Sequence, residues 1–251
     1  MSRDERTFGG PRLSDVAVPR ALAVGDMEIL GLLPGASNAT LLTRCVADDD
    51  EVLAVYKPRR GEAPLWDFPA GTLHRREVAA YVAARTLGWP NVPPTVLRGG
   101  PAGPGSAQLF VDADPSAHYF TLEADGRHGE TFRRVALFDL VVNNADRKAG
   151  HCLLDADGTI WVIDHGVCFS DEPKLRTVIW AFVGEPFPPE TIDDLRRFRH
   201  ELDVGGAAER ALGALLSPEE VAATRRRVDA VLRLGVFPEP GPGRPFPWPP
   251  I

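Results

Sequence analysis

The stretch from 139 to 166, DLVVNNADRKAGHCLLDADGTIWVIDHG, restricts the possible fold more than any other part of the sequence. Two short apolar runs within it, 151–154 and 160–163, predict a pair of strands joined by the turn DADGT. Asp146 precedes the first of these strands, and Asp164 directly follows the second. The fold must therefore accommodate two acidic loops that are connected by a strand–turn–strand unit.

The spacing of these acidic residues is typical of a phosphotransferase. In such an enzyme one carboxylate accepts the proton of the attacking hydroxyl or aligns it, and another holds the Mg²⁺ that bridges the nucleotide phosphates. Protein kinases place these groups in the patterns D-x-x-x-x-N and D-x-G. The offset from Asp146 to His151 matches the first pattern, and Asp164 begins a D-x-G tripeptide. We therefore expect Asp146 to be catalytic and Asp164, with His151, to bind metal. The alternative is that both aspartates stabilise turns, Asp146 in a pair with Arg147, and that His151 is a structural residue at the start of a strand.

A lysine and a glutamate upstream complete this interpretation. Lys57 ends a predicted strand in the motif YKP, and Glu77 follows twenty residues later inside a predicted helix. A strand lysine that reaches the α- and β-phosphates, held by a helix glutamate, is the second half of the kinase site. The alternative is an exposed lysine at a strand end and a solvated helix glutamate. The downstream aspartates favour a nucleotide-binding role for both residues.

Strand patterns occupy the first half of the chain. Short apolar runs bounded by turn residues predict five strands, with one helix between the third and the fourth. The glycine-rich segment GGPAGPGS, 99–106, is predicted to be a flexible loop between the last two strands. The predicted strands are 28–33, 40–46, 52–57, 92–98 and 107–112, and the helix is 72–87.

Helical patterns dominate the second half. The clearest signature is Ser217-Pro218-Glu219-Glu220, a capping box with proline at the first helical position. The fold class is therefore α+β, with two unequal lobes and a cleft between them. The predicted helices are 131–144, 190–202, 206–215 and 218–234. The predicted parts are a flexible N-terminal arm (1–19), an N-lobe (20–111), a helical C-lobe with the catalytic and metal loops (112–236) and a proline-rich, extended tail (237–251).

Two further segments are candidates for nucleotide contacts. The loop PGASNAT joins the first two strands, where a kinase lays its phosphate-covering loop, and its backbone amides with Ser37 and Asn38 could hold a phosphate. It carries a single glycine, so a plain hairpin loop is the alternative. The segment from Gln108 through Val111, which includes Phe110, occupies the position where a strand between two lobes offers its backbone to adenine.

The elements YKP, REVAAY, NxDRKxGH and IDHG resemble the phosphatidylinositol 3-/4-kinase-like atypical kinase superfamily, and more closely a bacterial, mainly actinobacterial, branch of it. The resemblance extends from about residue 28 to residue 234. It implies a two-lobed atypical kinase fold in which Lys57 binds ATP phosphates, Asp146 is the catalytic-loop aspartate and Asp164 is the principal Mg²⁺ ligand.

Two positions depart from the superfamily's pattern. The superfamily has Asn as the second metal ligand where this chain has His151, although Mg²⁺ prefers oxygen ligands. The replacement leaves open a tolerance for Mn²⁺, a single metal ion, or weak catalysis. The superfamily's DRH triplet is Asp-Arg-Lys here, so Lys148 either supplies the histidine's charge to the γ-phosphate or is merely exposed.

Charge and composition exclude several other classes of protein. The formal net charge of −7 disfavours a nucleic-acid partner, which a basic surface would attract. No apolar run reaches the ~20 residues of a transmembrane helix, and no signal peptide is evident. Three cysteines without metal-ligand spacing are typical of buried thiols in a reducing, cytoplasmic protein.

We therefore expect an ATP-dependent phosphotransferase that uses Mg²⁺ or Mn²⁺ and acts on a hydroxyl acceptor. The sequence leaves open whether the acceptor is a lipid, an inositol-like small molecule or a protein, and it does not define the oligomeric state. Two alternatives remain: a degenerate, nucleotide-binding pseudokinase with a regulatory role, and an enzyme that transfers AMP from the same fold.

Overall fold

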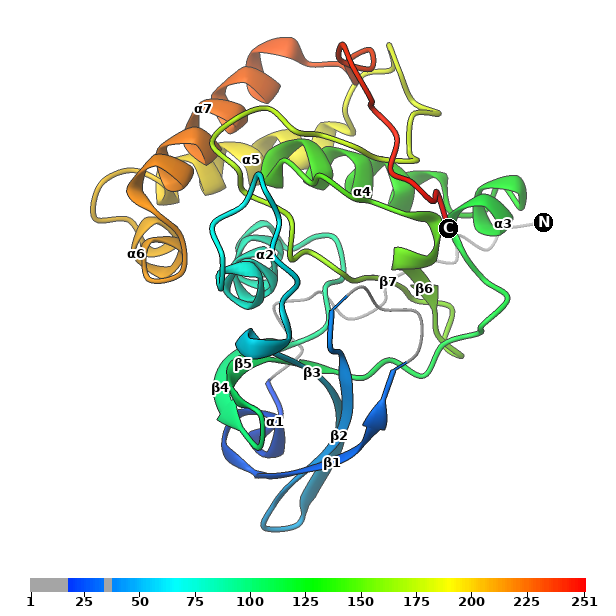
Figure 1. Cartoon of the computed structure of the whole chain (residues 1–251). Helices are drawn as coiled ribbons and strands as arrows, with labels where there is room; N and C mark the ends of the chain where they lie inside the picture. The colour runs from blue at the N-terminus through cyan, green and yellow to red at the C-terminus, as the bar shows by residue number, and fades with distance from the viewer. Residues whose placement is uncertain (1–17, 34–37) are drawn as a thin grey trace, which may run out of the picture.

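The computed structural model describes residues 18–33 and 38–251. Five antiparallel strands form one sheet in the order β1-β2-β3-β5-β4, and two more strands form a separate hairpin. Figure 1 shows the sheet at one end of the molecule and most of the helices at the other, with helix α2 (Leu73–Leu87) between them. The sheet strands are β1 (Asp26–Leu32), β2 (Leu41–Ala47), β3 (Asp50–Pro58), β4 (Thr95–Gly100) and β5 (Gly103–Leu109), and the hairpin strands are β6 (Cys152–Leu154) and β7 (Ile160–Val162).

Each helix and strand predicted from the sequence is present, with its ends shifted by a few residues. Two short helices, α1 (Arg20–Val24) and α3 (Tyr119–Ala124), were not predicted, because five or six residues are too few to show a helical period. The predicted capping box of the last long helix is confirmed, since Ser217 Oγ accepts from the backbone amide of Glu220. The helices are α1 (Arg20–Val24), α2 (Leu73–Leu87), α3 (Tyr119–Ala124), α4 (Gly129–Val142), α5 (Pro189–Glu201), α6 (Ala207–Gly213) and α7 (Pro218–Leu234).

The prediction of a flexible loop over 99–106 is wrong. Strands β4 and β5 continue through most of this segment and pair in register until Gly100 lies opposite Gly103. Glycine is needed in these strands because β3 passes very close. A Cβ atom on Gly105 would lie 2.5 Å from the carbonyl oxygen of Lys57 and 2.8 Å from the ring of Tyr56. The glycines therefore permit a tightly packed strand pair beside the strand that carries Lys57.

Helix α2 is part of the helical core although it follows the first three strands of the sheet. Its small buried residues, among them Ala80, Ala83 and Ala84, belong to one apolar cluster with residues of α4, α5, α6 and α7. A second, smaller cluster lies under the sheet and includes Ala21 of α1. Glu77 on α2 is consequently held by the helical core, whereas Lys57 is held by the sheet.

Other expectations concern the thiols, the membrane and the ends of the chain. Cys45, Cys152 and Cys168 are buried and free, as the sequence predicted. None of the described helices combines the length and the apolar character needed to cross a bilayer. Most of the predicted N-terminal arm lies outside the described residues. The tail, 237–251, contains no helix or strand.

Candidate active site

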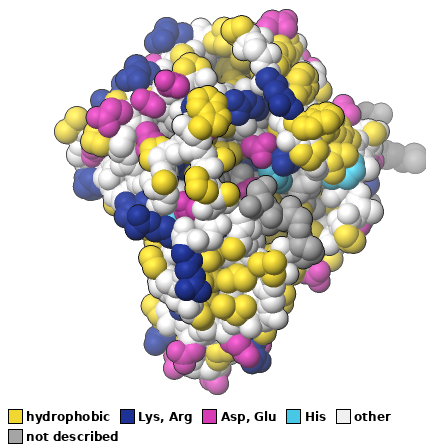
Figure 2. All heavy atoms as spheres, viewed as in Figure 1, with side chains coloured by type: hydrophobic (Ala, Val, Ile, Leu, Met, Phe, Trp, Pro, Cys, Tyr) yellow, Lys and Arg dark blue, Asp and Glu magenta, His cyan; other side chains and the backbone are white. Residues whose placement is uncertain are grey.

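A cavity of about 430 Å³ lies where the sheet meets the loops that flank β6 and β7. Figure 2 shows the face of the molecule viewed in Figure 1, with acidic, cationic and histidine side chains near its centre. The cavity brings together most of the site residues predicted from the sequence, although they come from five separate segments. These residues are Asn38, Lys57, Gln108, Phe110, Asp146, Lys148, His151 and Asp164.

Lys57 is the point where the sheet, α2 and the second acidic loop meet. Its Nζ lies 2.5 Å from Oε1 of Glu77 and 3.0 Å from Oδ1 of Asp164. The second oxygen of Glu77 accepts a hydrogen bond from the backbone amide of His165 at 2.9 Å. Glu77 therefore lies behind Lys57 rather than in the cavity wall, and it holds both the lysine and the acidic loop in place.

This arrangement changes the protonation of its members. Burial by itself would lower the pKa of Lys57, but the carboxylates of Asp164 and Glu77 outweigh burial and raise it. The Lys57 ammonium in turn holds the pKa of Asp164 well below its usual range. Lys57 is thus a fixed cation and Asp164 a fixed anion at neutral pH, as a phosphate contact and a metal ligand require.

Asp146 occupies a different environment from Asp164. Its carboxylate lines the cavity, and its nearest cation is Lys148, with 3.6 Å between Oδ2 and Nζ. Burial raises the pKa of Asp146; Lys148 lowers it in part, and Asp164 raises it further. Two neighbouring carboxylates with pKa values shifted in opposite directions are suited to different tasks, one to proton transfer and the other to binding a cation.

The sequence interpretation missed a buried network that holds the first acidic loop. Arg147 is fully buried and pairs with Asp139 of α4, with 3.0 Å between Nη2 and Oδ1. The same guanidinium donates to the carbonyl oxygen of Ile163 at 2.9 Å and contacts Nε2 of His165 at 2.7 Å. Arg147 therefore pairs with Asp139 and not with Asp146, and it connects the loop of Asp146 to the loop of Asp164.

His151 also connects the two loops. Its Nδ1 accepts from the backbone amide of Lys148 at 3.3 Å, so a neutral ring carries its proton on Nε2, which lies 3.3 Å from Oδ2 of Asp164. Burial lowers the pKa of His151 to about 4, although Asp164 acts in the opposite direction. The ring is neutral at pH 7 and orients Asp164. It would bind a metal ion only by giving up this hydrogen bond.

The donor set fits a metal ion that is shared with phosphates. Within the described residues no three His, Cys, Asp or Glu side chains converge as a preformed metal centre. Asp164 and His151 together supply two potential metal ligands, and no third such side chain joins them among the described residues. Mg²⁺ is commonly held by one or two carboxylates together with substrate phosphates and water. These residues fit a metal ion that takes its other ligands from substrate phosphates and water. They do not fit a site in which the protein supplies all the ligands.

The remaining predicted nucleotide contacts lie in the cavity wall with some of their groups already bonded. Asn38 Oδ1 accepts from the backbone amide of Ala63 at 2.7 Å, and Gln108 Nε2 donates to Thr95 Oγ1 at 2.8 Å. The backbone amide of Phe110 donates to the carbonyl oxygen of Leu53. These groups shape the wall, and the Phe110 amide is not free for a ligand. Ser37 lies outside the described residues.

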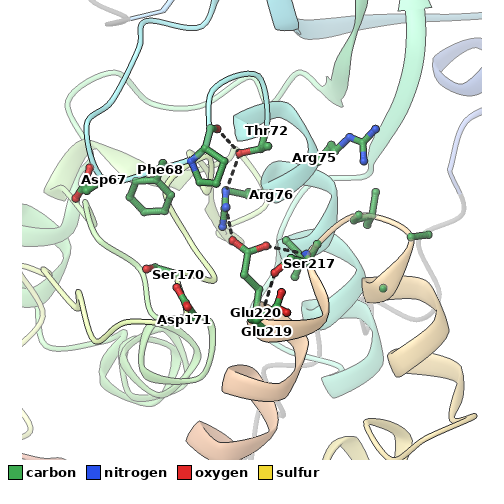
Figure 3. A pocket seen from close by; sticks show the side chains of 15 residues that line it. Asp67, Phe68, Thr72, Arg75, Arg76, Ser170, Asp171, Ser217, Glu219 and Glu220 are labelled. Atoms are coloured by element: carbon green, nitrogen blue, oxygen red, sulfur yellow. Dashed lines mark hydrogen bonds and ion pairs between the residues drawn. The ribbon is translucent and has the colours of Figure 1, made fainter.

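A second cavity, of about 500 Å³, lies beside the start of α2 and the start of α7 (Figure 3). Arg76 points into this region, donates to the carbonyl oxygen of Cys168 at 2.6 Å and pairs with Glu220. The site residues predicted from the sequence do not line it. This second cavity is therefore not the predicted active site.

Comparison with known proteins defines the family. No family model matches the chain. It is 39% identical over 261 residues to protein Rv2133c of Mycobacterium tuberculosis, a match that covers 91% of this chain and 93% of that protein. The chain belongs to the Rv2133c family. It is also 32% identical over 171 residues to phosphatidylinositol 4-kinase gamma 4 of Oryza sativa subsp. japonica, which covers 57% of this chain and 30% of the plant protein.

The solved structures confirm the fold. The crystal structure of the Helicobacter pylori proinflammatory kinase CtkA superimposes with a TM-score of 0.52 at 10% sequence identity, over 86% of this chain and 94% of that chain. The predicted α+β, two-lobed kinase-like fold is therefore confirmed. The placement in a mainly actinobacterial branch, the boundaries of the parts and the roles of the individual site residues stay predictions.

Proposed function

We propose that this protein is an ATP-dependent, divalent-metal-dependent phosphotransferase that acts on a hydroxyl acceptor. The observation that carries the proposal is the convergence of Lys57, Asp146 and Asp164 in one cavity of about 430 Å³. Separate segments supply these residues, and each has the charge that phosphoryl transfer requires. The kinase-like fold and the kinase names of the plant relatives support the same reaction class.

Each residue has a distinct task in the proposed reaction. Lys57, fixed by Glu77, would bind the α- and β-phosphates, and Lys148 would face the γ-phosphate. Asp146 would align the acceptor hydroxyl and accept its proton, a task that suits a carboxyl whose pKa is raised. Gln108 and Phe110 would form the wall around the nucleobase, and Asn38 would lie near the phosphates.

Asp164 would hold Mg²⁺ or Mn²⁺, with His151 either orienting it or joining it as a ligand. When bound, the metal ion would neutralise and align the phosphate oxygens. Asp164 is suited to this because its pKa lies below the usual range. His151 departs from the oxygen ligands that Mg²⁺ prefers, so both metals belong in the assay.

The proposal is tested by ATP turnover of the purified chain with Mg²⁺ or Mn²⁺. Asp164→Asn is expected to abolish metal-dependent turnover without unfolding the protein, because this side chain is 49% exposed and Glu77 remains paired with Lys57. Asp193→Asn is the matched control, since its carboxylate is 84% exposed on α5. Full activity of the Asp164 variant would refute the assignment.

The products of the same assay distinguish the alternatives. ADP formation indicates phosphoryl transfer, whereas pyrophosphate and an adenylylated acceptor indicate AMP transfer. Nucleotide binding without turnover would indicate a regulatory, catalytically degenerate protein. Because the plant relatives are named phosphatidylinositol 4-kinases, phosphatidylinositol vesicles, free inositol and a generic protein acceptor are the three acceptors to compare.

A further inference from the structure

The proline-rich tail does not project away from the molecule. Figure 1 shows it crossing the helical lobe from the end of α7 and ending beside β6. The part from 245 to 251, here called the strap, is bonded to the body near both of its ends. The backbone amide of Thr177 donates to the carbonyl oxygen of Pro245 at 3.0 Å, and the backbone amide of Ala149 donates to that of Pro250 at 2.8 Å.

The second of these bonds ties the strap to the loop of the candidate active site. Ala149 directly follows Lys148, two positions after Arg147. Between the two bonds, the ring of Phe246 meets the ring of Trp180 edge to face, with 6.5 Å between centroids. Four of the seven strap residues are prolines, which restrict the backbone to extended conformations and reduce the entropy lost on docking.

Ile251 lies where two cavities adjoin. It lines the candidate active site and also a neighbouring cavity of about 340 Å³. The residues shared by both cavities are Phe110, Val111, Gly150, Leu153 and Ile251. Two of them, Phe110 and Val111, follow β5 in the segment assigned to the nucleobase, so Ile251 lies on the nucleoside side of the site.

We propose that the end of the strap forms part of the wall of the nucleotide cavity through Ile251, that this side chain contacts the nucleoside part of a bound nucleotide, and that the strap must detach for the nucleotide to leave. This inference rests on the proposed nucleotide-binding function. Two backbone hydrogen bonds, the contact of Phe246 with Trp180 and the burial of Pro247 hold the strap. Phe246, Trp248 and Ile251 are each about half exposed or more, so the strap can open locally while the rest of the fold stays intact. Its release would join the cavity to its neighbour.

The test uses the chain of residues 1–251, N-methylanthraniloyl-ATP with Mg²⁺ or Mn²⁺, and stopped-flow fluorescence. Phe246→Asp removes the contact with Trp180, and Ile251→Ser removes the apolar group at the cavity. Either is expected to raise the nucleotide dissociation rate constant by about tenfold, because weakened contacts act mainly on dissociation. Val204→Asp is the control: it adds the same charge at a surface residue that is 88% exposed and remote from the strap, and it should leave the rate unchanged.

Hydrogen exchange on the same proteins gives a readout that needs no nucleotide. The amides of Thr177 and Ala149 should lose protection in Phe246→Asp and keep it in Val204→Asp. If the nucleotide binds and both strap variants dissociate at the wild-type rate, the strap inference is overturned while the proposed function stands. If the wild-type protein binds no nucleotide with either metal, the proposed function fails, and the inference fails with it.

Discussion

Lys57 Nζ lies 3.0 Å from Oδ1 of Asp164, although the two residues are 107 positions apart. The same ammonium lies 2.5 Å from Oε1 of Glu77, whose side chain is only 3% exposed. One cation therefore compensates two carboxylates, one from a helix and one from a loop. Lys57 thereby links the sheet, helix α2 and the loop of Asp164 through two ion pairs.

The first prediction concerns the stability that Lys57 provides. Lys57→Met leaves Glu77 buried without its cation, and breaking a buried pair in this way should lower the free energy of unfolding by about 3 kcal/mol. Urea denaturation measures the change. The double variant Lys57→Met/Glu77→Gln removes the buried charge but keeps an oxygen for the backbone amide of His165. It should recover most of the stability but no ATP turnover. A single variant as stable as the wild type would show that the pair does not stabilise the fold.

The second prediction concerns the pH dependence of turnover. In the proposed reaction Asp146 accepts a proton and must be deprotonated to do so. Burial raises its pKa, so the rate should fall as the pH drops through this raised value. Lys148 lowers the pKa of Asp146 in part. Lys148→Met should therefore move the acidic limb of the pH–rate profile to higher pH, by about one unit. Lys174→Met is the control, since this lysine pairs with Asp67 and Glu172 and not with Asp146. If the acidic limb of the pH–rate profile moves equally in both variants, Asp146 is not the group that sets it.

The third prediction concerns the metal preference. His151→Asn provides an amide oxygen in place of the imidazole, and oxygen is the ligand that Mg²⁺ prefers. The Mg²⁺ concentration for half-maximal turnover should fall by about tenfold, whereas that for Mn²⁺ should change less. Metal titrations of the wild type and the variant measure both values, and chelation by EDTA should stop turnover in each. An unchanged or higher Mg²⁺ requirement would show that His151 acts only by orienting Asp164.

The fourth prediction concerns the buried network behind the site. Arg147→Met leaves Asp139 fully buried without a cation and should cost about 3 to 5 kcal/mol of stability. Arg134→Met removes an arginine on the surface of α4 that pairs with Glu190, where both side chains are at least 40% exposed. This control should change stability by less than about 1 kcal/mol. Thermal or urea unfolding measures the loss of stability in both arginine variants. Equal losses would show that the buried pair of Arg147 and Asp139 contributes no more than a surface pair.

Much of the fold could be predicted from the sequence because its signals are local. Apolar runs, turn residues and the capping box at Ser217 depend on residues a few positions apart, and the corresponding strands and helices are present. The segment 99–106 could not be predicted in this way. Its glycines indicated a loop, but they serve the close approach of β5 to Tyr56 and Lys57 on β3, which is a contact between strands distant in sequence.

The candidate site likewise has features that the sequence determines locally and features that depend on contacts between distant segments. The sequence alone determined which side chains carry the charges, because the spacing of Asp146, His151 and Asp164 is fixed within one short stretch. Tertiary structure decided how these groups are held and protonated. Arg147 pairs with Asp139, and the tail returns to Ala149, through packing that no local pattern encodes. Burial and neighbouring charges exist only once distant segments meet, so the pKa shifts of Lys57 and Asp146 belong to the folded chain.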